Sequence, residues 1–470
     1  MTHTFFWHDY ETFGATPRSD RPAQFAGIRT DLDLNQMGEP IMLYCKPALD
    51  ALLPSPQACL ITGITPSLCE KQGVTEREFA ACIEHALATP GTIGVGYNSI
   101  RFDDEVTRFL FWRNLIDPYA REWQNNCGRW DLLDVVRGLY ALFPDSLSWP
   151  RNEAGNVSFK LAELSVANGL VHENAHDALS DVRATIALAR LIKKAQPKFF
   201  NFCLTLRSKE VVRTQICLNA KRPLLHISGM YGLERSCLAL VWPLAEHPTN
   251  KNEVIVWDLT SDPSILQGLA PDEIRTRLFS KQDELPNNTL RLPIKTVSLN
   301  KSPFIMHDLR VLTPLRIARL AIDIDLIFRH AENAKELNLA PNLWHDVYKR
   351  DSYEALDVDE DLYGGFLSNH DRYLLNRLRA LAPDLLAVEN PQFGDKRLQA
   401  LFFRYRARNF PHSLKAQEHV DWQSFCAKKF TSKLESFWKE FNSLEQVATE
   451  AQSIILRDIK IWVELHKDSG

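Results

Sequence analysis

Residues 4–12, with the sequence TFFWHDYET, constrain the fold more than any other stretch of this chain. The first four are aromatic or β-branched and predict a strand of a buried sheet. Because side chains alternate along a strand, Asp9 and Glu11 lie on one face of it. Two adjacent carboxylates repel each other, and a divalent cation between them relieves the repulsion; hard oxygen ligands suit Mg²⁺ or Mn²⁺ better than Zn²⁺. The pair equally fits a strand end whose acids face water, so a metal site requires further ligands.

Length and composition limit the class of protein. At 470 residues the chain is too long for one compact core, and about three domains are expected. Its 45% hydrophobic and 24% charged content is typical of soluble proteins. No apolar run approaches the roughly 18 residues of a membrane span, and the N-terminus lacks a signal-peptide pattern, so we expect a cytoplasmic protein without membrane contact. The formal charge of −4 means that a polyanionic ligand must bind to local basic surface.

The cysteines favour neither disulfides nor zinc. There are nine, an odd number, scattered along the chain without a C-x-x-C pair. A disulfide framework or a zinc module is therefore not expected.

Several elements are predicted to follow the first strand. Strands at residues 26–30 and 41–45 would form an antiparallel meander with it, and a helix at residues 76–89 precedes a short strand at 92–96. Residues 60–65, LITGIT, place apolar side chains beside a glycine. They fit a wedge next to the metal site or a turn, and the sequence does not decide between the two.

A third acid is predicted where the strand at residues 92–96 leads into a helix. Asp103 and Asp104 stand at this junction. An acid in such a place can cap the helix by accepting its free backbone N–H groups, which accounts for one of the two. We assign Asp103 to the metal site, since Asn98 precedes it by five residues.

The segment NAHDALSDVRAT, residues 174–185, supplies the remaining candidates. It leads into an apolar helix through residue 192. Asp181 on this helix can ligate a metal ion, while His176, in the turn before it or in its first turn, approaches from the solvent side. A lone histidine is usually structural, but this one accompanies an acid at a useful spacing.

Together these residues predict phosphodiester hydrolysis. Two metal ions about 4 Å apart can hold a scissile phosphate. Asp9, Glu11 and Asp181 would be direct ligands, and Asp103 would ligate directly or through water. His176, with an unperturbed pKa near 6.5, would take the proton from the attacking water. Activity should depend strictly on the cation.

Three basic residues in the same part of the chain are candidates for phosphate contacts. Arg129 and Arg137 fit either such contacts or ordinary ion pairs. Lys160 falls in the first turn of a helix whose predicted N-cap is Ser158, where a cation opposes the helix dipole. That placement favours a phosphate-facing role for Lys160 about as much as plain exposure.

The order D-x-E, N-x-x-x-x-D and H-x-x-x-x-D resembles the DEDD exonucleases of the branch whose base is histidine. Within that superfamily the stretches HDYETFG, DRPAQFAGIRTD, ITGIT, GYNSIRFDDEVTRF, RWDLLDV, NAHDALSDVRATIALA and FRYRARNFP resemble the bacterial exonuclease I family, along essentially the whole chain.

The resemblance implies an RNase H-like α/β exonuclease domain. It also implies processive, Mg²⁺-dependent removal of 5′-mononucleotides from single-stranded DNA in the 3′-to-5′ direction, and a role in DNA repair and recombination. Metal binding falls on Asp9, Glu11, Asp103 and Asp181, and the role of base on His176. Substrate contact falls on Glu11 and Lys160; the family favours arginine at the latter position, and lysine keeps the charge but loses the bidentate fork. A single-stranded-DNA-binding protein is an implied partner, and a monomer is expected.

The pattern of the chain changes after residues 193–198, KKAQPK, which end a long helix. Short strand-like runs follow at residues 211–214, 224–228, 238–242, 254–259 and 292–299. They predict a small barrel, and the resemblance implies an SH3-like one. We expect an exonuclease domain at 1–196, an SH3-like β domain at 197–351 and an all-α domain at 352–470.

Two features stand out in the last domain. The acidic run 357–361 is linker-like, and we interpret it as a solvated face in preference to a metal site. On the helix at 396–408, Arg397, Arg404 and Arg408 form a stripe opposite an apolar one, which fits either phosphate contacts or an ordinary amphipathic helix. In the family this domain closes over the exonuclease domain and leaves a groove that admits one strand.

The leading hypothesis is a 3′-to-5′ exonuclease acting on single-stranded DNA. Within the same class, the alternative is a related exonuclease that acts on RNA 3′ ends or in proofreading. Outside it, the alternative is an inactive single-strand-binding module, against which the presence of all five expected site residues argues.

Overall fold

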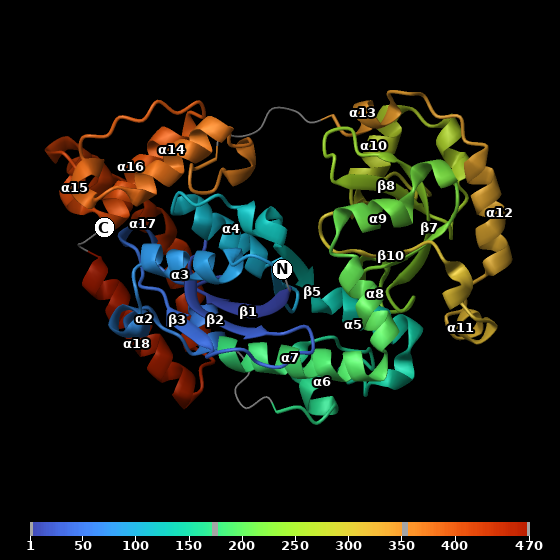
Figure 1. Cartoon of the computed structure of the whole chain (residues 1–470), viewed down its shortest axis with the longest axis horizontal. Helices are drawn as coiled ribbons and strands as arrows, with labels where there is room; N and C mark the ends of the chain where they lie inside the picture. The colour runs from blue at the N-terminus through green and yellow to red at the C-terminus, as the bar shows by residue number, and fades with distance from the viewer. Residues whose placement is uncertain (1–2, 172–176, 350–355, 468–470) are drawn as a thin grey trace. The chain divides into compact units, whose positions relative to one another are not determined.

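The computed structural model describes residues 3–171, 177–349 and 356–467. The chain divides into two compact units (Figure 1). Residues 1–129, 171–186 and 355–470 form the first unit, and residues 130–170 and 187–354 form the second. The two ends of the sequence thus belong to the same unit.

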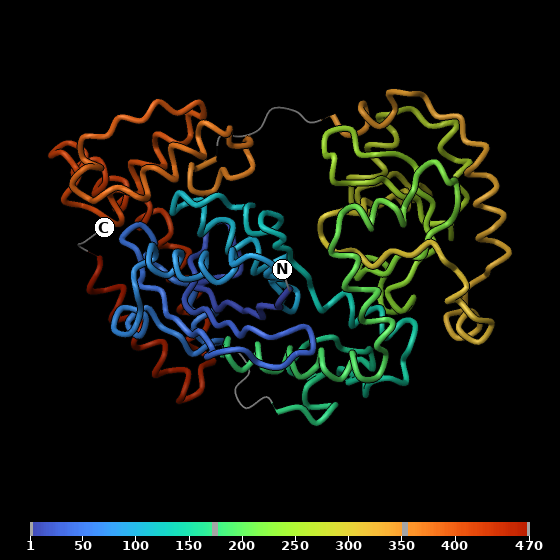
Figure 2. The backbone as a smooth tube through the Cα atoms, in the orientation of Figure 1, coloured from blue at the N-terminus to red at the C-terminus, as the bar shows by residue number. Residues whose placement is uncertain are grey.

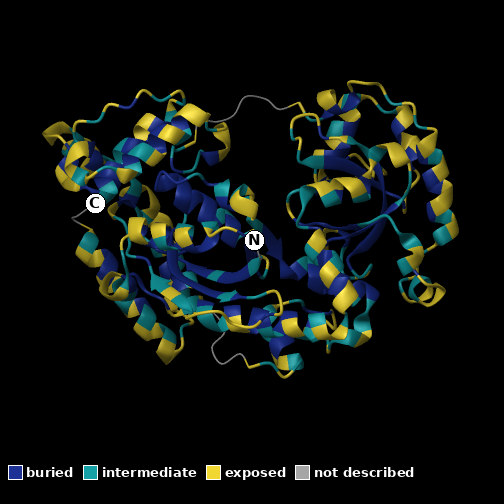
Figure 3. Ribbon diagram, viewed as in Figure 1, coloured by how far each residue is buried: buried dark blue, intermediate teal, exposed yellow. Residues whose placement is uncertain are grey.

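A five-stranded mixed sheet is the centre of the first unit, and Figure 3 shows its strands as mostly buried. The strands are β1 Thr4–Thr12, β2 Pro22–Thr30, β3 Ile41–Tyr44, β4 Thr92–Gly96 and β5 Gly128–Asp131. Their order across the sheet is β3-β2-β1-β4-β5, with β1 antiparallel to β2 and parallel to β4. The predicted meander of the first three strands is confirmed.

Helices surround this sheet. Those wholly in the first unit are α1 Pro56–Thr62, α2 Pro66–Gln72, α3 Glu76–Ala88, α4 Asp103–Arg113, α14 Asn369–Ala380, α15 Pro383–Leu386, α16 Arg397–Asn409, α17 Ala416–Glu445 and α18 Glu450–His466; α7 Ala178–Ala195 continues into the second unit. The predicted helix at residues 76–89 and the helical C-terminal part are confirmed. Residues 60–65 form the end of α1 and the turn after it, where Gly63 has a left-handed φ of 71°.

The two faces of β1 have different roles. Phe6 and Tyr10 point to one face and form a buried core with side chains of α3 and α4, among them Phe79 and Leu110. Residues at odd positions alternate to the other face, where the first turn of α7 brings Asp181 close to Asp9 and Glu11. The alternation of the strand therefore separates the apolar core from the acids.

The C-terminal helices pack against the N-terminal part of the chain (Figure 2, red beside blue). α17 contacts α1 and the short helix η1 Leu49–Ala51, α18 contacts α1 and α2, and α16 contacts α4. Phe437 and Trp462 share a core with Phe13. The Trp462 indole also donates a hydrogen bond to the Leu52 carbonyl at 2.9 Å.

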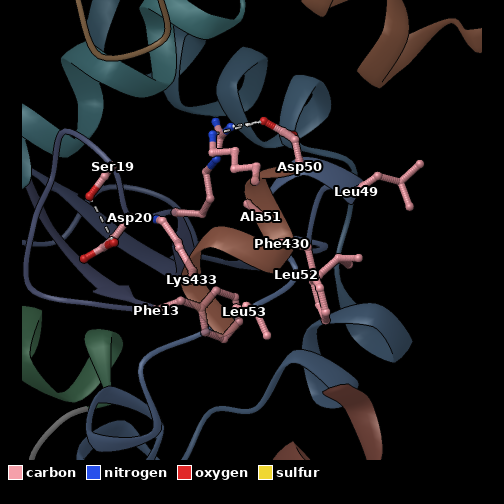
Figure 4. A pocket seen from close by; sticks show the side chains of 12 residues that line it. Phe13, Ser19, Asp20, Leu49, Asp50, Ala51, Leu52, Leu53, Phe430 and Lys433 are labelled. Atoms are coloured by element: carbon pink, nitrogen blue, oxygen red, sulfur yellow. Dashed lines mark hydrogen bonds and ion pairs between the residues drawn. The ribbon is translucent and has the colours of Figure 1, made fainter. Parts of the chain in front are cut away.

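Buried ion pairs join the same two parts. Asp50 on η1, labelled in Figure 4, accepts hydrogen bonds from Arg21 at 2.8 Å and from Arg408 on α16 at 2.7 Å. Arg408 also binds Asp359. Burial alone would raise the pKa of Asp50, but Arg408 and Arg21 outweigh burial and hold this pKa well below its usual range.

The ion pairs of Asp50 and Asp359 contradict the prediction for the run 357–361. They also decide between the two interpretations of the arginine stripe on α16. The run 357–361 is not a solvated face, because Asp359 is only 2% exposed and pairs with Arg404 and Arg408. Arg397 likewise pairs with Asp395 at 2.6 Å. The arginine stripe of α16 therefore binds acids of its own chain, a partnership between distant segments that hydropathy alone does not reveal.

A small cavity of about 30 Å³ lies beside the Arg21–Asp50 pair (Figure 4). Phe13 and Asp20 line it from the β1–β2 loop, and Lys433 lines it from α17. None of the four predicted metal ligands lines this cavity. It is a packing feature of the junction with the C-terminal helices.

The second unit is built on a five-stranded antiparallel sheet with the order β10-β6-β7-β8-β9. Its strands are β6 Leu224–Ile227, β7 Leu238–Glu246, β8 Glu253–Asp258, β9 Ile294–Ser298 and β10 Phe304–Met306. Its helices are α5 Leu132–Leu142, α6 Leu161–Ala167, α8 Pro197–Thr205, α9 Lys209–Ile216, α10 Pro271–Phe279, α11 Pro314–Arg319, α12 Ile324–Lys335 and α13 Leu343–Val347.

The sequence predicts four of these strands and misses β10. The strand predicted at residues 211–214 is wrong, since these residues lie within α9. Val212 and Ile216 are buried there at helical spacing, and a β-branched run of four residues does not distinguish a strand from one face of a helix.

The state of the cysteines and the character of the helices bear on disulfides and membrane spans. All nine cysteines are free thiols in this structure. Across residues 3–171, 177–349 and 356–467, no helix combines the length and apolar character needed to cross a bilayer.

Replacing Arg408 with Met should destabilise the protein, because Asp50 and Asp359 stay buried after losing a shared counter-charge. We expect a loss of about 3–5 kcal/mol in the free energy of unfolding, measured with urea on the full chain. The matched control is Arg213→Met, which removes an exposed pair with Glu210 and should cost about 1 kcal/mol or less. Equal small losses in both variants would contradict the structural role of the network.

Candidate active site

Three carboxylates meet at the end of β1. Asp9 and Glu11 lie side by side on one face of this strand, and Asp181 lies in the first turn of α7. One oxygen of each carboxylate lies within 4.8 Å of the other two. The structure thus brings together acids that are 170 residues apart in the sequence, because the start of α7 is hydrogen-bonded to Gln24 on β2.

Asp103 reaches the same strand from α4. β4 pairs with β1 only as far as Trp7 and Val95, which leaves the next part of that edge of β1 to another acceptor. Asp103 Oδ1 accepts a hydrogen bond there from the backbone N–H of Tyr10, at 3.0 Å. Since Tyr10 stands between Asp9 and Glu11, this bond places the Asp103 carboxylate beside both.

Asp104 has a different environment. Its carboxylate accepts hydrogen bonds from Arg121 at 2.6 Å and Arg129 at 3.0 Å. Burial would raise the pKa of Asp104, but the two arginines hold it well below its usual range. The capping interpretation of this second acid is wrong, because Asp104 is a buried ion-pair residue.

The arginine candidates are ion-paired. Arg129 is 5% exposed and binds Asp104, and Arg137 binds Asp134 at 2.6 Å. The ion-pair interpretation therefore accounts for both guanidinium groups.

The carboxylates of this cluster repel one another, and no cationic side chain of the described residues is among the main influences on the pKa values of Asp9 and Glu11. Burial raises the pKa of Asp9 well above its usual value, and Asp103, Glu11 and Asp181 raise it further. Burial and then Asp181 and Asp103 raise the pKa of Glu11 to about 8. Several hard oxygen donors that repel one another fit a divalent cation, which would replace the protons they otherwise hold.

The two histidines of the sequence motifs differ. His176 lies outside the described residues. His8, next to Asp9, points to the opposite face of β1 and is 2% exposed. Burial, followed by the charge of Arg121, lowers the pKa of His8 to about 4, so it is neutral at pH 7 and separate from the acid cluster.

Lys160 belongs to the second unit. The predicted cap at Ser158 is wrong: α6 begins at Leu161, so Lys160 itself is the N-cap, and its backbone N–H donates to Ser158 Oγ at 3.3 Å. Its side chain is 79% exposed, with the amine 3.3 Å from Glu163. The amine is thus accessible to a ligand.

Two residues beside the cluster were not assigned a role from the sequence. Asp177 precedes α7 and accepts a hydrogen bond from the Ser180 N–H at 3.1 Å, as an N-cap does. An acid just before a helical pattern is a recognisable N-cap signal. Gln24 stands opposite Glu11 in the β1–β2 register, and no local pattern marks it, because its significance depends on strand pairing.

Three family models match the chain. A model described as exonuclease matches residues 6–189, the exonuclease I SH3-like domain matches residues 207–350, and the exonuclease I C-terminal domain matches residues 356–466. The predicted three-part architecture, an RNase H-like exonuclease domain followed by an SH3-like and a helical domain, is confirmed.

The curated relatives and solved structures that are similar to this chain belong to the same family as these models. The chain is 43% identical to exodeoxyribonuclease I of Haemophilus influenzae, over 99% of this chain and 95% of the relative, and 43% identical to that of Escherichia coli, over 96% of each.

Exonuclease I from Methylocaldum szegediense superimposes with a TM-score of 0.94 at 44% identity, covering 99% of this chain and all of the other. E. coli exonuclease I in complex with a dA16 oligonucleotide superimposes with a TM-score of 0.92 at 41% identity, covering 98% and 99%. A zinc-bound E. coli complex with single-stranded DNA gives 0.92 at 40%, covering 99% of each chain.

Replacing Glu11 with Gln should change the pH dependence of stability. In the cation-free fold the pKa of Glu11 is about 8, against 4.5 ordinarily. Its protonated carboxyl therefore contributes stability that is fully present below about pH 4.5 and is lost as the pH rises through about 8. In EDTA we expect Glu11→Gln to match wild type in Tm at pH 4.5 and to exceed it at pH 8.5. The same Tm difference at both pH values would contradict the shift; Glu210→Gln, an exposed acid, is the control.

Proposed function

The chain belongs to the exonuclease I family, and we propose that it degrades single-stranded DNA processively from the 3′ end and releases 5′-mononucleotides. The observation that carries this conclusion is the cluster of Asp9, Glu11 and Asp181 within a domain matched by the exonuclease family. The chain is a hydrolytic nuclease. Relatives along nearly its whole length are exodeoxyribonucleases, and those of E. coli have been solved with single-stranded oligonucleotides.

Asp9, Glu11, Asp103 and Asp181 would hold two Mg²⁺ ions, for which Mn²⁺ can substitute. The hard oxygen donors and the raised pKa values of Asp9 and Glu11 support this assignment. The zinc-bound E. coli complex supports a divalent cation in the family. When bound, such ions stabilise the negative charge that develops on the scissile phosphate.

The remaining roles belong to side chains. His176 takes a proton from the water that attacks phosphorus, the bond from phosphorus to the 3′ oxygen breaks, and the leaving 3′ oxygen takes up a proton from solvent. The shortened strand then ends in a 3′ hydroxyl, and the released nucleotide keeps its 5′ phosphate. An unperturbed histidine titrates near pH 6.5, which suits a base at neutral pH. Glu11 and Lys160 contact the strand, and the exposed amine of Lys160 supports its part.

The proposal extends to organisation and role. The matched ranges 6–189, 207–350 and 356–466 support domains at 1–196, 197–351 and 352–470. The family resemblance alone supports a monomer that acts in DNA repair and recombination in the cytoplasm, with a single-stranded-DNA-binding protein as partner.

The direct test is digestion of end-labelled single-stranded DNA with one terminus blocked. We expect a 3′ block to stop release of mononucleotides, a 5′ block to leave it intact, and EDTA to abolish it. An RNA oligonucleotide of the same sequence should be a much poorer substrate. Equal rates on RNA and DNA would favour an exonuclease of RNA ends, and binding without cleavage would favour a binding module.

Replacing His176 with Ala tests the base. Loss of a general base typically lowers turnover by about 10²–10⁴-fold, whereas affinity for single-stranded DNA should stay near that of wild type. Single-turnover cleavage and fluorescence anisotropy measure the two quantities. His345→Ala, at an exposed position, is the matched control. Undiminished cleavage by the His176 variant would remove the assignment.

A further inference from the structure

Gln24 is a buried amide held at both ends. It lies on β2 and is 1% exposed. Its amide nitrogen donates a hydrogen bond to Asp177 Oδ1 at 3.2 Å, and its amide oxygen accepts one from the Ala178 backbone N–H at 3.1 Å. Each end of the amide therefore has one partner at the start of α7.

These bonds connect the sheet to Asp181. The Asp177 carboxylate caps α7 through the Ser180 N–H, and the Asp177 carbonyl accepts the N–H of Asp181 at 3.0 Å. On the strand side, Gln24 pairs in register with Glu11. One side chain thus links the strand pair that carries Glu11 to the helical turn that carries Asp181.

We infer that Gln24 is a positioning residue for the nuclease site, an inference that rests on the proposed function. By fixing the first turn of α7 against β2, Gln24 sets the Asp181 carboxylate relative to those of Asp9 and Glu11. Ligands of a cation must be held to a fraction of an ångström, and residues that orient them typically affect cation affinity or activity by about 10–100-fold.

The amide chemistry is specific. Asp177 requires a donor and Ala178 requires an acceptor, and a glutamine supplies both without a charge. A glutamate of the same size would still accept from Ala178 but would face Asp177 with a second anion. If Gln24 only filled space, replacing it with glutamate would change the site little. If its two hydrogen bonds hold the start of α7, the same replacement should disturb the site.

We call the hydrogen bonds of Gln24 to Asp177 and Ala178 the Gln24 clamp. A double-mutant cycle tests this clamp. Gln24→Glu loses the donor to Asp177, and Asp177→Asn loses the anionic cap. In the double variant the new amide at position 177 can donate to the new carboxylate at position 24, which reverses the direction of the bond and restores the number of charges.

We expect each single variant to lower kcat and to weaken Mn²⁺ binding by about 10–100-fold, with KM for single-stranded DNA little changed. The double variant should recover most of both losses. Mn²⁺ binding is followed by electron paramagnetic resonance of the full-length protein, so it is measured independently of turnover.

Gln24→Met keeps the volume and removes both bonds, and it should show the same losses with a smaller change in Tm. Gln36→Glu, at an exposed position, is the matched control and should behave as wild type. Wild-type kcat and Mn²⁺ affinity in both Gln24→Glu and Gln24→Met, or losses that follow Tm without recovery in the double variant, would overturn the inference. If wild type does not cleave single-stranded DNA, the proposed function fails by itself, and the Mn²⁺ measurements still decide on the clamp.

Discussion

Repulsion among buried and half-buried carboxylates at the end of β1 is the constraint on which the rest of this structure depends. Asp9 and Glu11 are adjacent on one face, and Asp181 and Asp103 approach them although each addition raises the pKa of its neighbours. Such an arrangement does not form by attraction between its members. It persists because strand pairing, the core beneath Tyr10 and hydrogen bonds to the backbone hold each acid in place.

The chain contains a second set of buried acids, whose pKa values are lowered by arginine partners and not raised by other acids. Asp50 and Asp359 are each surrounded by arginines, and these cations overcome burial and lower the pKa of both carboxyls. Asp104 shows the same pattern directly behind the site. These three acids are thus paired with arginine, whereas Asp9 and Glu11 in the cluster at β1 have raised pKa values. This difference in charge balance, more than the number of acids, marks where a divalent cation fits.

Much of the fold follows from local patterns in the sequence, and the failures share one cause. The strand at residues 4–12, the following meander and the helix at 76–89 are visible because alternation and helical spacing are local. The run 357–361 has the composition of a linker, and its burial follows only from the ion pairs of Asp359 with Arg404 and Arg408 of α16. Whether the β-branched run within α9 forms a strand or a helix depends on what it packs against. Asp9, Glu11, Asp103 and Asp181 could be proposed from their spacing, while Gln24 becomes visible only through strand register.

The chemical type of Gln24 fits the electrostatics of the cluster it adjoins. A lysine or arginine at this position would bind Asp177 more strongly than an amide does, but its charge would partly neutralise the acids and so compete with a divalent cation. A carboxylate would add to the repulsion. A neutral amide that donates to Asp177 and accepts from the Ala178 N–H orients the start of α7 and leaves the negative charge of the site unchanged. The site is therefore held together by hydrogen bonds in the place where ion pairs, used elsewhere in this unit, would lower its affinity for a cation.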